Sequence, residues 1–154
     1  MTERQPMVEE TSAGDDAPAA PRRGLPSRDR PARDPGSEGE QDALALAHRI
    51  VDLAADKKAS DIVLLAVGQL TTVSDYFVIC SGGSERQLGA IADGIAEGLK
   101  SDGVMPIGRE GGTTAHWVLL DFGAVIVHVM ARPERDYYQL EKLWSEAPLL
   151  LRVL

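Results

Sequence analysis

The chain has 154 residues, of which 44% are hydrophobic, and its formal net charge at pH 7 is −8. This length is enough for one ordinary domain with a real hydrophobic core. Nucleic-acid affinity comes largely from lysine and arginine side chains that neutralise phosphates, so an acidic domain is poorly suited to bind DNA or bare RNA. No apolar run approaches the length of a membrane span, and we expect no membrane partner.

Residues 1–40 differ in composition from the rest of the chain. They hold six of the nine prolines and carry nine acids and six bases, which gives −3 and leaves −5 for residues 41–154. Such a segment cannot bury enough apolar surface to offset its ordering entropy, so we expect a disordered tail over 1–40 and a folded α/β domain over 41–154. The tail lacks the apolar core of a secretory signal and Cys80 is the single cysteine, which predicts a cytoplasmic protein without disulfides.

The folded part begins with one helical pattern and two strands. Apolar residues recur at helical spacing over 41–58, which predicts an amphipathic helix. Residues 62–67 and 75–80 are short, apolar and rich in β-branched or aromatic residues, so each is predicted to be a strand buried on both faces.

The segment 84–103 is predicted to be a second helix. Ser84 and Gln87 match a capping box at its start, in which a hydroxyl and a side-chain amide satisfy backbone N–H groups. Gly103 can end the helix in a left-handed conformation. A short strand is expected over 104–108.

The last part of the chain predicts a hairpin and a final helix. Strands over 116–120 and 125–130 flank a turn at 121–124. The final helix follows Pro133 and ends before Pro148, and its expected apolar face carries Tyr137, Leu140 and Trp144. This order of elements indicates a mixed β-sheet flanked by helices, in the α/β or α+β class, with one parallel strand pair made by a crossover helix.

A glycine-rich turn, Gly82-Gly83-Ser84, precedes the second predicted helix, where backbone N–H groups can bind a phosphate. No lysine follows the serine as in a full phosphate-binding loop, so we favour a tight turn with a helix cap. Nucleotidyl transfer on a similar scaffold would need paired carboxylates to hold two metal ions. Asp93 and Asp121 each stand alone, so we expect no cofactor and no catalytic residue.

The predicted hairpin sorts its side chains onto two faces. If Asp121 lies opposite Ala124, then Trp117 lies opposite His128, and His116 and His128 point to opposite faces and cannot share a metal ion. One face is apolar and predicts core. The other mixes Trp117 and His128 with aliphatic residues, which is typical of an interface. The alternative, a helix that covers this face, remains open.

Five segments carry sequence motifs that are informative in combination: Ser74-Asp75-Tyr76-Phe77-Val78-Ile79-Cys80-Ser81-Gly82-Gly83-Ser84 with Arg86-Gln87, Glu110-Gly111, Trp117-Val118-Leu119-Leu120-Asp121-Phe122-Gly123, Val127-His128-Val129, and Tyr137-Tyr138-Gln139-Leu140-Glu141-Lys142-Leu143-Trp144. Motifs of this kind, in this order and at similar spacing, occur in the ribosomal silencing factor family (RsfS), also called Iojap-related. The chain resembles that family over residues 42–148.

The resemblance implies a nucleotidyltransferase-like fold without the catalytic carboxylates, and a chain that is not an enzyme. It implies binding to the large ribosomal subunit through ribosomal protein fourteen, which blocks joining to the small subunit and represses translation when nutrients are short. Family members often form homodimers. Because the domain is acidic, we expect direct contact with ribosomal RNA to be minor at most. A nucleotide-binding or nucleotidyltransferase-like activity on the same scaffold is the alternative.

The residues at matching motif positions are candidates for partner binding: Trp117, Asp121 and His128 on the hairpin, and Tyr138, Leu140, Glu141 and Trp144 in the closing motif. The resemblance suggests that Trp117 is a hydrophobic anchor and that Asp121 and Glu141 face basic groups on the partner. Three positions depart from the family pattern, so contact details can differ there: Ala66, Gly83 and Ala124.

Overall fold

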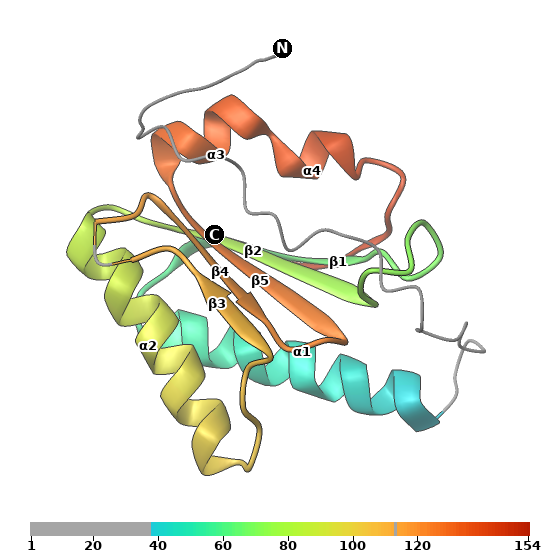
Figure 1. Ribbon diagram of the computed structural model, residues 1–154. Coiled ribbons are helices and arrows are strands. Elements are labelled where there is room, and N and C mark those ends of the chain that lie inside the picture. Colours follow the sequence, from blue (N-terminus) through green and yellow to red (C-terminus); the bar gives the residue numbers. More distant parts are fainter. Residues whose placement is uncertain (1–37, 113) are drawn as a thin grey trace.

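The computed structural model describes residues 38–112 and 114–154, which form a six-stranded sheet with helices on both faces (Figure 1). Along the chain, the elements are α1 (Glu38–Asp56), β1 (Ser60–Ala66), β2 (Tyr76–Gly82), α2 (Glu85–Ser101), β3 (Gly108–Glu110), β4 (Trp117–Asp121), β5 (Val125–Ala131), α3 (Arg132–Tyr138), α4 (Leu140–Leu143) and β6 (Leu149–Val153). The predicted fold class is confirmed, whereas the likeness to nucleotidyltransferases stays a prediction. The predicted tail lies outside the described residues, except that α1 already begins at Glu38.

The strands lie in the order β3-β4-β5-β2-β1-β6. At the centre, β2 and β5 pair in parallel, and the other neighbouring pairs are antiparallel. Parallel neighbours need a long crossover connection. The chain makes it through α2, β3 and β4, so the expected parallel pair is confirmed.

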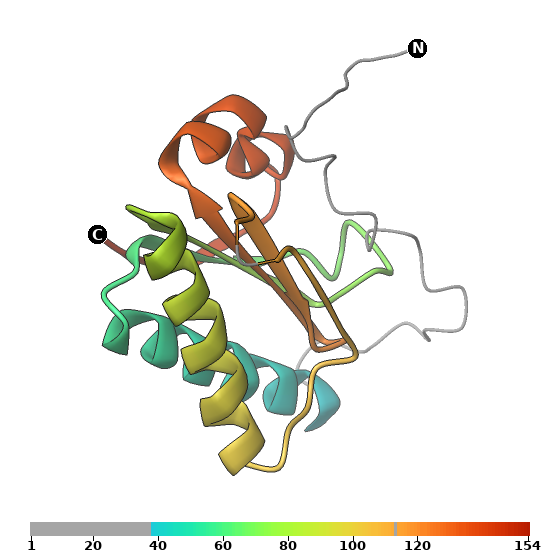
Figure 2. The same ribbon diagram turned by 60° about the vertical axis from the view of Figure 1, so that its left-hand side comes forward.

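Two layers of helices cover the sheet. The long helices α1 and α2 lie on one face, and the short helices α3 and α4 lie on the other (Figure 2). Side chains alternate along each strand, so Tyr76 and Val78 join the core under α1 and α2, while Phe77 and Ile79 join the core under α3 and α4. The strands β1 and β2 are thus buried on both faces, as their composition predicted.

Both ends of α2 are capped as the sequence predicted. Ser84 Oγ accepts the N–H of Gln87 at 3.1 Å, and the Gln87 side chain accepts the N–H of the residue before the serine at 2.6 Å. At the other end, Gly103 has a φ of 85° and Val104 donates to the Leu99 carbonyl at 2.8 Å. That bond and the left-handed glycine are the signs of a Schellman cap.

Three elements differ from what the sequence led us to expect. The strand expected over 104–108 lies instead at β3, because Pro106 has no N–H to offer a sheet. The edge strand β6 was not expected; it pairs with β1 beyond the predicted helix end. The final helix is interrupted at Gln139, whose φ of 50° separates α3 from α4. Tyr137 consequently leaves the face that carries Leu140.

The hairpin register also differs from the expected one. Trp117 pairs with Met130 rather than with His128. The strands are joined at Gly123-Ala124, where Gly123 takes a φ of 83°. The pairing has moved by an even number of positions, which keeps every side chain on its predicted face because side chains alternate with a period of two.

Gly98 lets α1 and α2 approach closely, and this contact can be tested. A Cβ at Gly98 would lie 2.5 Å from Leu53 Cδ2, whereas one at Gly89 on the same helix meets nothing within 4 Å. We predict that Gly89→Ala raises the free energy of unfolding by about 0.5–1 kcal/mol, because alanine is the better helix former. Gly98→Ala must push Leu53 aside, so it should be less stable than Gly89→Ala by about 1 kcal/mol or more. Urea denaturation measures both, and equal stabilities would contradict the close packing.

Candidate functional site

Five ring side chains form an aromatic cluster between the sheet and the α3–α4 pair: Phe77, Trp117, His128, Tyr138 and Trp144. The Trp117 ring centroid lies 4.8 Å from that of Tyr138, and the Phe77 centroid lies 5.1 Å from those of His128 and Trp144. These edge-to-face and tilted contacts are arrangements that aromatic pairs prefer. The cluster therefore attaches the two short helices to the sheet.

The sequence left two interpretations of this sheet face, an exposed interface or a face covered by a helix. In the structure, α3 and α4 cover it. Trp117, Asp121 and His128 are only 5%, 6% and 7% exposed. Asp121 turns into its own hairpin, where its Oδ1 accepts the N–H of Gly123 at 2.8 Å. Trp117 is therefore largely inaccessible in the isolated chain, and its ring packs against Tyr138 of the helix above it. Partner binding by the candidate residues as a set stays a prediction.

Exposed apolar side chains do occur on the covering helices, at positions that are not among the candidate partner-binding residues. Tyr137 is 78% exposed and Leu143 is 73% exposed, whereas Leu140 is buried. Tyr138 and Trp144 lie between these extremes. The break at Gln139 turns Tyr137 outward, and no sequence signal marks that break, because glutamine seldom takes a left-handed conformation.

A second group of residues, the Arg135 cluster, joins α3 to the sheet: Asp61, Ser81, Arg135, Glu141 and Arg152. The Arg135 side chain is 3% exposed. It donates to the Asp61 carbonyl at 2.6 Å, to Ser81 Oγ at 2.9 Å, and to Glu141 Oε2 at 2.7 and 3.1 Å. Arg152 on β6 donates to both carboxylate oxygens of Asp61, at 2.9 and 3.1 Å. The cluster thus connects β1, β2, α3, α4 and β6.

The charges of the Arg135 cluster are balanced within the chain. Burial would raise the pKa of Asp61, but the hydrogen bond from Arg152 and the charges of Arg135 and Arg132 lower it below its ordinary value. Glu141 pairs with Arg135, and the expected contact of Glu141 with a basic partner stays a prediction. The adjoining cavity of about 330 Å³ is lined by side chains of both signs, so it favours neither an anion nor a cation.

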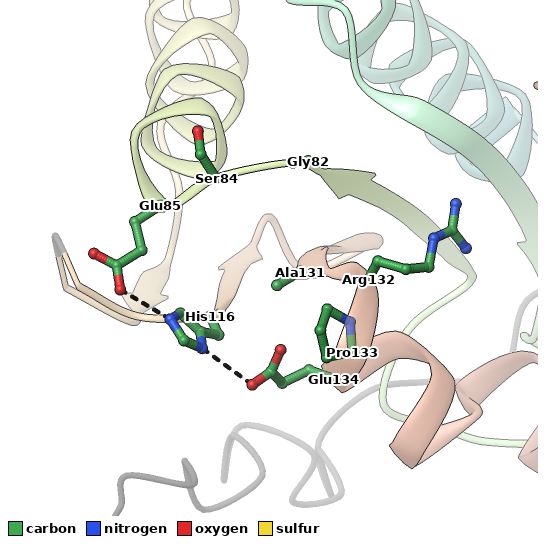
Figure 3. Close-up of a pocket in the computed structure, with 9 residues that line it drawn as sticks. Gly82, Ser84, Glu85, His116, Ala131, Arg132, Pro133 and Glu134 are labelled. Atoms are coloured by element: carbon green, nitrogen blue, oxygen red, sulfur yellow. Dashed lines mark hydrogen bonds and ion pairs between the residues drawn. The ribbon is translucent and has the colours of Figure 1, made fainter.

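A cavity of about 390 Å³ lies where the parallel strands β2 and β5 end and α2 begins (Figure 3). Open α/β sheets usually hold ligands at the carboxyl ends of their parallel strands. Here His116 places Nε2 2.9 Å from Glu85 Oε2 and Nδ1 3.1 Å from Glu134 Oε2. The hydrogen bonds to Glu85 and then to Glu134 raise the pKa of His116.

The chemistry of this cavity does not favour a phosphate. Ser84 Oγ already accepts the Gln87 N–H and Gln87 Oε1 already accepts the Gly83 N–H, and Glu85 and Glu134 place negative charge at the rim. In the part of the chain that the structure describes, no group of three or more His, Cys, Asp or Glu side chains could hold a metal ion. The arrangement agrees with the tight turn and cap predicted for the glycine-rich segment.

The histidine of the aromatic cluster is neutral. Trp117 Nε1 donates to His128 Nδ1 at 3.2 Å, so the ring proton is on Nε2, which has no hydrogen-bond partner among the described residues. Burial lowers the pKa of His128 to about 3. The pKa values of His116 and His128 are therefore shifted in opposite directions, and the two residues lie on opposite faces.

The family model described as "Ribosomal silencing factor during starvation" (RsfS) matches residues 40–152. The chain belongs to this family. The RsfS of Bacillus subtilis is 47% identical over 94 residues, which are 61% of this chain and 80% of the relative. The RsfS of Halalkalibacterium halodurans is 44% identical over 108 residues, which are 70% of this chain and 90% of the relative. A crystal structure of a Chromobacterium violaceum protein matches with a TM-score of 0.65 and 36% identity, over 67% of this chain and 86% of that one.

The family recognised from the five sequence motifs is thereby confirmed. The RsfS match runs from α1 into β6, so the aromatic cluster and the Arg135 cluster both lie inside it. No described helix has the length and apolar character needed to cross a membrane.

We predict that Arg135→Lys lowers the free energy of unfolding by about 2 kcal/mol or more, because a lysine cannot replace the buried guanidinium fork and leaves its acceptors unpaired. The matched control is Arg152→Lys. Arg152 also binds Asp61, but its side chain is 47% exposed, and we expect a loss below about 1 kcal/mol. Equal losses in urea denaturation would mean that the Arg135 cluster does not stabilise the fold more than a surface pair.

A further prediction concerns the loss of folding stability at low pH. The pKa of His128 is near 3 in the folded chain and near the ordinary value of about 6.5 when unfolded, so the unfolded state binds the extra proton between these values. The contribution of His128 to the free energy of unfolding should therefore have its full value above about pH 6.5 and decrease as the pH is lowered. The slope from this residue approaches about 1.4 kcal/mol per pH unit. His128→Asn should show a shallower fall in denaturation curves between about pH 6 and pH 4. Parallel slopes in the two proteins would contradict a neutral, buried His128.

Proposed function

We propose that the chain acts in the cytoplasm as a ribosomal silencing factor. It binds the large ribosomal subunit through ribosomal protein fourteen, on the face that meets the small subunit, and prevents joining when nutrients are limited. The observation that carries the proposal is the RsfS match over residues 40–152, supported by two bacterial relatives that bear the RsfS name. Steric exclusion needs only a folded surface, without catalysis or a cofactor.

The charge of the domain supports a protein partner rather than RNA. Residues 41–154 carry fifteen acids and ten bases, a net charge of −5. A negative surface is attracted to a basic ribosomal protein and repelled by the ribosomal RNA phosphates, so RNA contacts should be few. The family resemblance adds a homodimer of the free protein to the proposal.

We place the contact surface on the α3–α4 pair. Tyr137 and Leu143 are the large apolar side chains that these helices leave exposed, and aromatic residues are preferred contact residues. Of the candidate residues, Tyr138, Glu141 and Trp144 are partly exposed and can touch the partner. The remaining candidates are buried and would act by holding the helices in place: Trp117, Asp121, His128 and Leu140.

Sucrose-gradient sedimentation of purified ribosomal subunits tests the proposal. At a magnesium concentration that allows joining, added protein should travel with large subunits and reduce the joined peak, because it occupies the joining face. Small subunits alone should not carry it. Normal joining, with the protein left at the top of the gradient, would contradict the proposed function.

A pair of matched variants tests the contact surface. Replacing Tyr137 and Leu143 together by serine should weaken binding to large subunits at least tenfold, or about 1.4 kcal/mol, because apolar contacts are lost. The control replaces Met105 and Ile107 by serine; both are exposed but lie in the segment between α2 and β3. Both double variants should keep the melting temperature of the parent. Equal affinities for large subunits would exclude the α3–α4 surface.

A further inference from the structure

His116 joins two segments that are far apart in the sequence. Its ring lies between Glu85, the first residue of α2, and Glu134, in the first turn of α3 (Figure 3). The Nε2 atom is 2.9 Å from one carboxylate and the Nδ1 atom is 3.1 Å from the other. Each ring nitrogen is therefore within hydrogen-bonding distance of a carboxylate oxygen.

Both contacts can be hydrogen bonds only if the ring carries two protons. A neutral imidazole has one N–H and one lone pair, while an ionised carboxylate can only accept. With a single proton, one ring nitrogen would set its lone pair against a carboxylate oxygen, and that contact is repulsive. The observed geometry is thus that of the imidazolium, and the raised pKa of His116 agrees with it.

The charges around His116 come from the two helices that it joins. Glu85 belongs to α2 and Glu134 to α3, and Glu134 Oε1 is buried without a hydrogen-bond partner among the described residues. Arg132 lines the same cavity, but its guanidinium points away from His116 (Figure 3). It lies 3.6 Å from Asp61. Loss of the His116 charge would therefore leave two carboxylates at the rim with no cation between them.

We propose that His116 is a pH-dependent clasp between α2 and the start of α3, closed while the imidazole carries both protons and open once it loses one. The N-cap residue of α3, Ala131, makes no side-chain cap hydrogen bond, so at this end of the helix the His116 ring adds its contact to the backbone bond from Ala131 N–H to the His116 carbonyl at 2.8 Å. Opening would widen the cavity at the ends of β2 and β5 and loosen the helix that carries Tyr137. This property belongs to the isolated protein and does not depend on the proposed ribosomal role.

NMR of the full chain tests the clasp. Imidazole ¹⁵N shifts, recorded from about pH 5 to pH 9, report the proton count on His116, which should titrate with a midpoint above the ordinary value of about 6.5. Hydrogen-exchange protection factors of amides in α3 should fall several-fold as the pH passes that midpoint. In His116→Gln, these amides should show low protection at every pH. His48→Gln removes an exposed imidazole from α1 and should behave like the parent.

The two hydrogen bonds can be separated by Glu85→Gln, which removes one negative charge and should lower the midpoint of His116 while Glu134 keeps its bond. A midpoint at or below about 6.5 in the parent chain would overturn the proposal. Protection of α3 that stays constant through a raised midpoint would overturn it as well, and it would leave His116 as an ion pair without a conformational role. If His116→Gln fails to fold, the His116 midpoint and the α3 protection measured in the parent chain still test the proposal.

Discussion

The sheet is apolar on both faces, so each face needs a cover, and the cover on one side is unusually small. Every residue of β2 and β4 is buried. The long helices α1 and α2 cover one face, but the other depends on α3 and α4, with seven and four residues. Helices of that length are not stable by themselves in water. They stay in place because Tyr138 and Trp144 pack on rings of the sheet and Arg135 binds three elements at once.

Two polar residues close to this small layer are accommodated in different ways. Arg135 keeps its charge, because acceptors on β1, β2 and α4 surround its guanidinium. A buried charge is tolerated only with such partners. His128 has no charged partner and remains neutral, with its Nδ1 bound to Trp117. A change at Trp117 or His128 would first loosen the cover, so any loss of partner binding has to be compared with the loss of folding stability.

The elements with strong periodicity could be predicted from the sequence. The apolar stripe of α1, the capping box at Ser84 and the uninterrupted apolar runs of β1 and β2 are local signals, and the structure has all of them. The motif order also predicted the family. The break at Gln139 and the edge strand β6 could not be predicted, because each depends on distant contacts with the sheet rather than on local preference.

In the candidate site, too, local features could be predicted from the sequence and distant contacts could not. The sequence placed Trp117 and His128 correctly on one face of the hairpin, yet it could not say what covers that face, since coverage depends on the path of the last helices. The partners of Arg135 and His116 are likewise remote: Arg135 lies 74 residues from Asp61 and His116 lies 31 residues from Glu85. Spacing along the chain carries no signal for such pairs.

Cryo-electron microscopy of isolated large subunits with the added protein would show where the chain binds. We expect density for the α/β domain on the face that meets the small subunit, against ribosomal protein fourteen, with α3 and α4 at the contact. Density elsewhere on the subunit, or a contact made by the opposite layer of α1 and α2, would contradict this expectation.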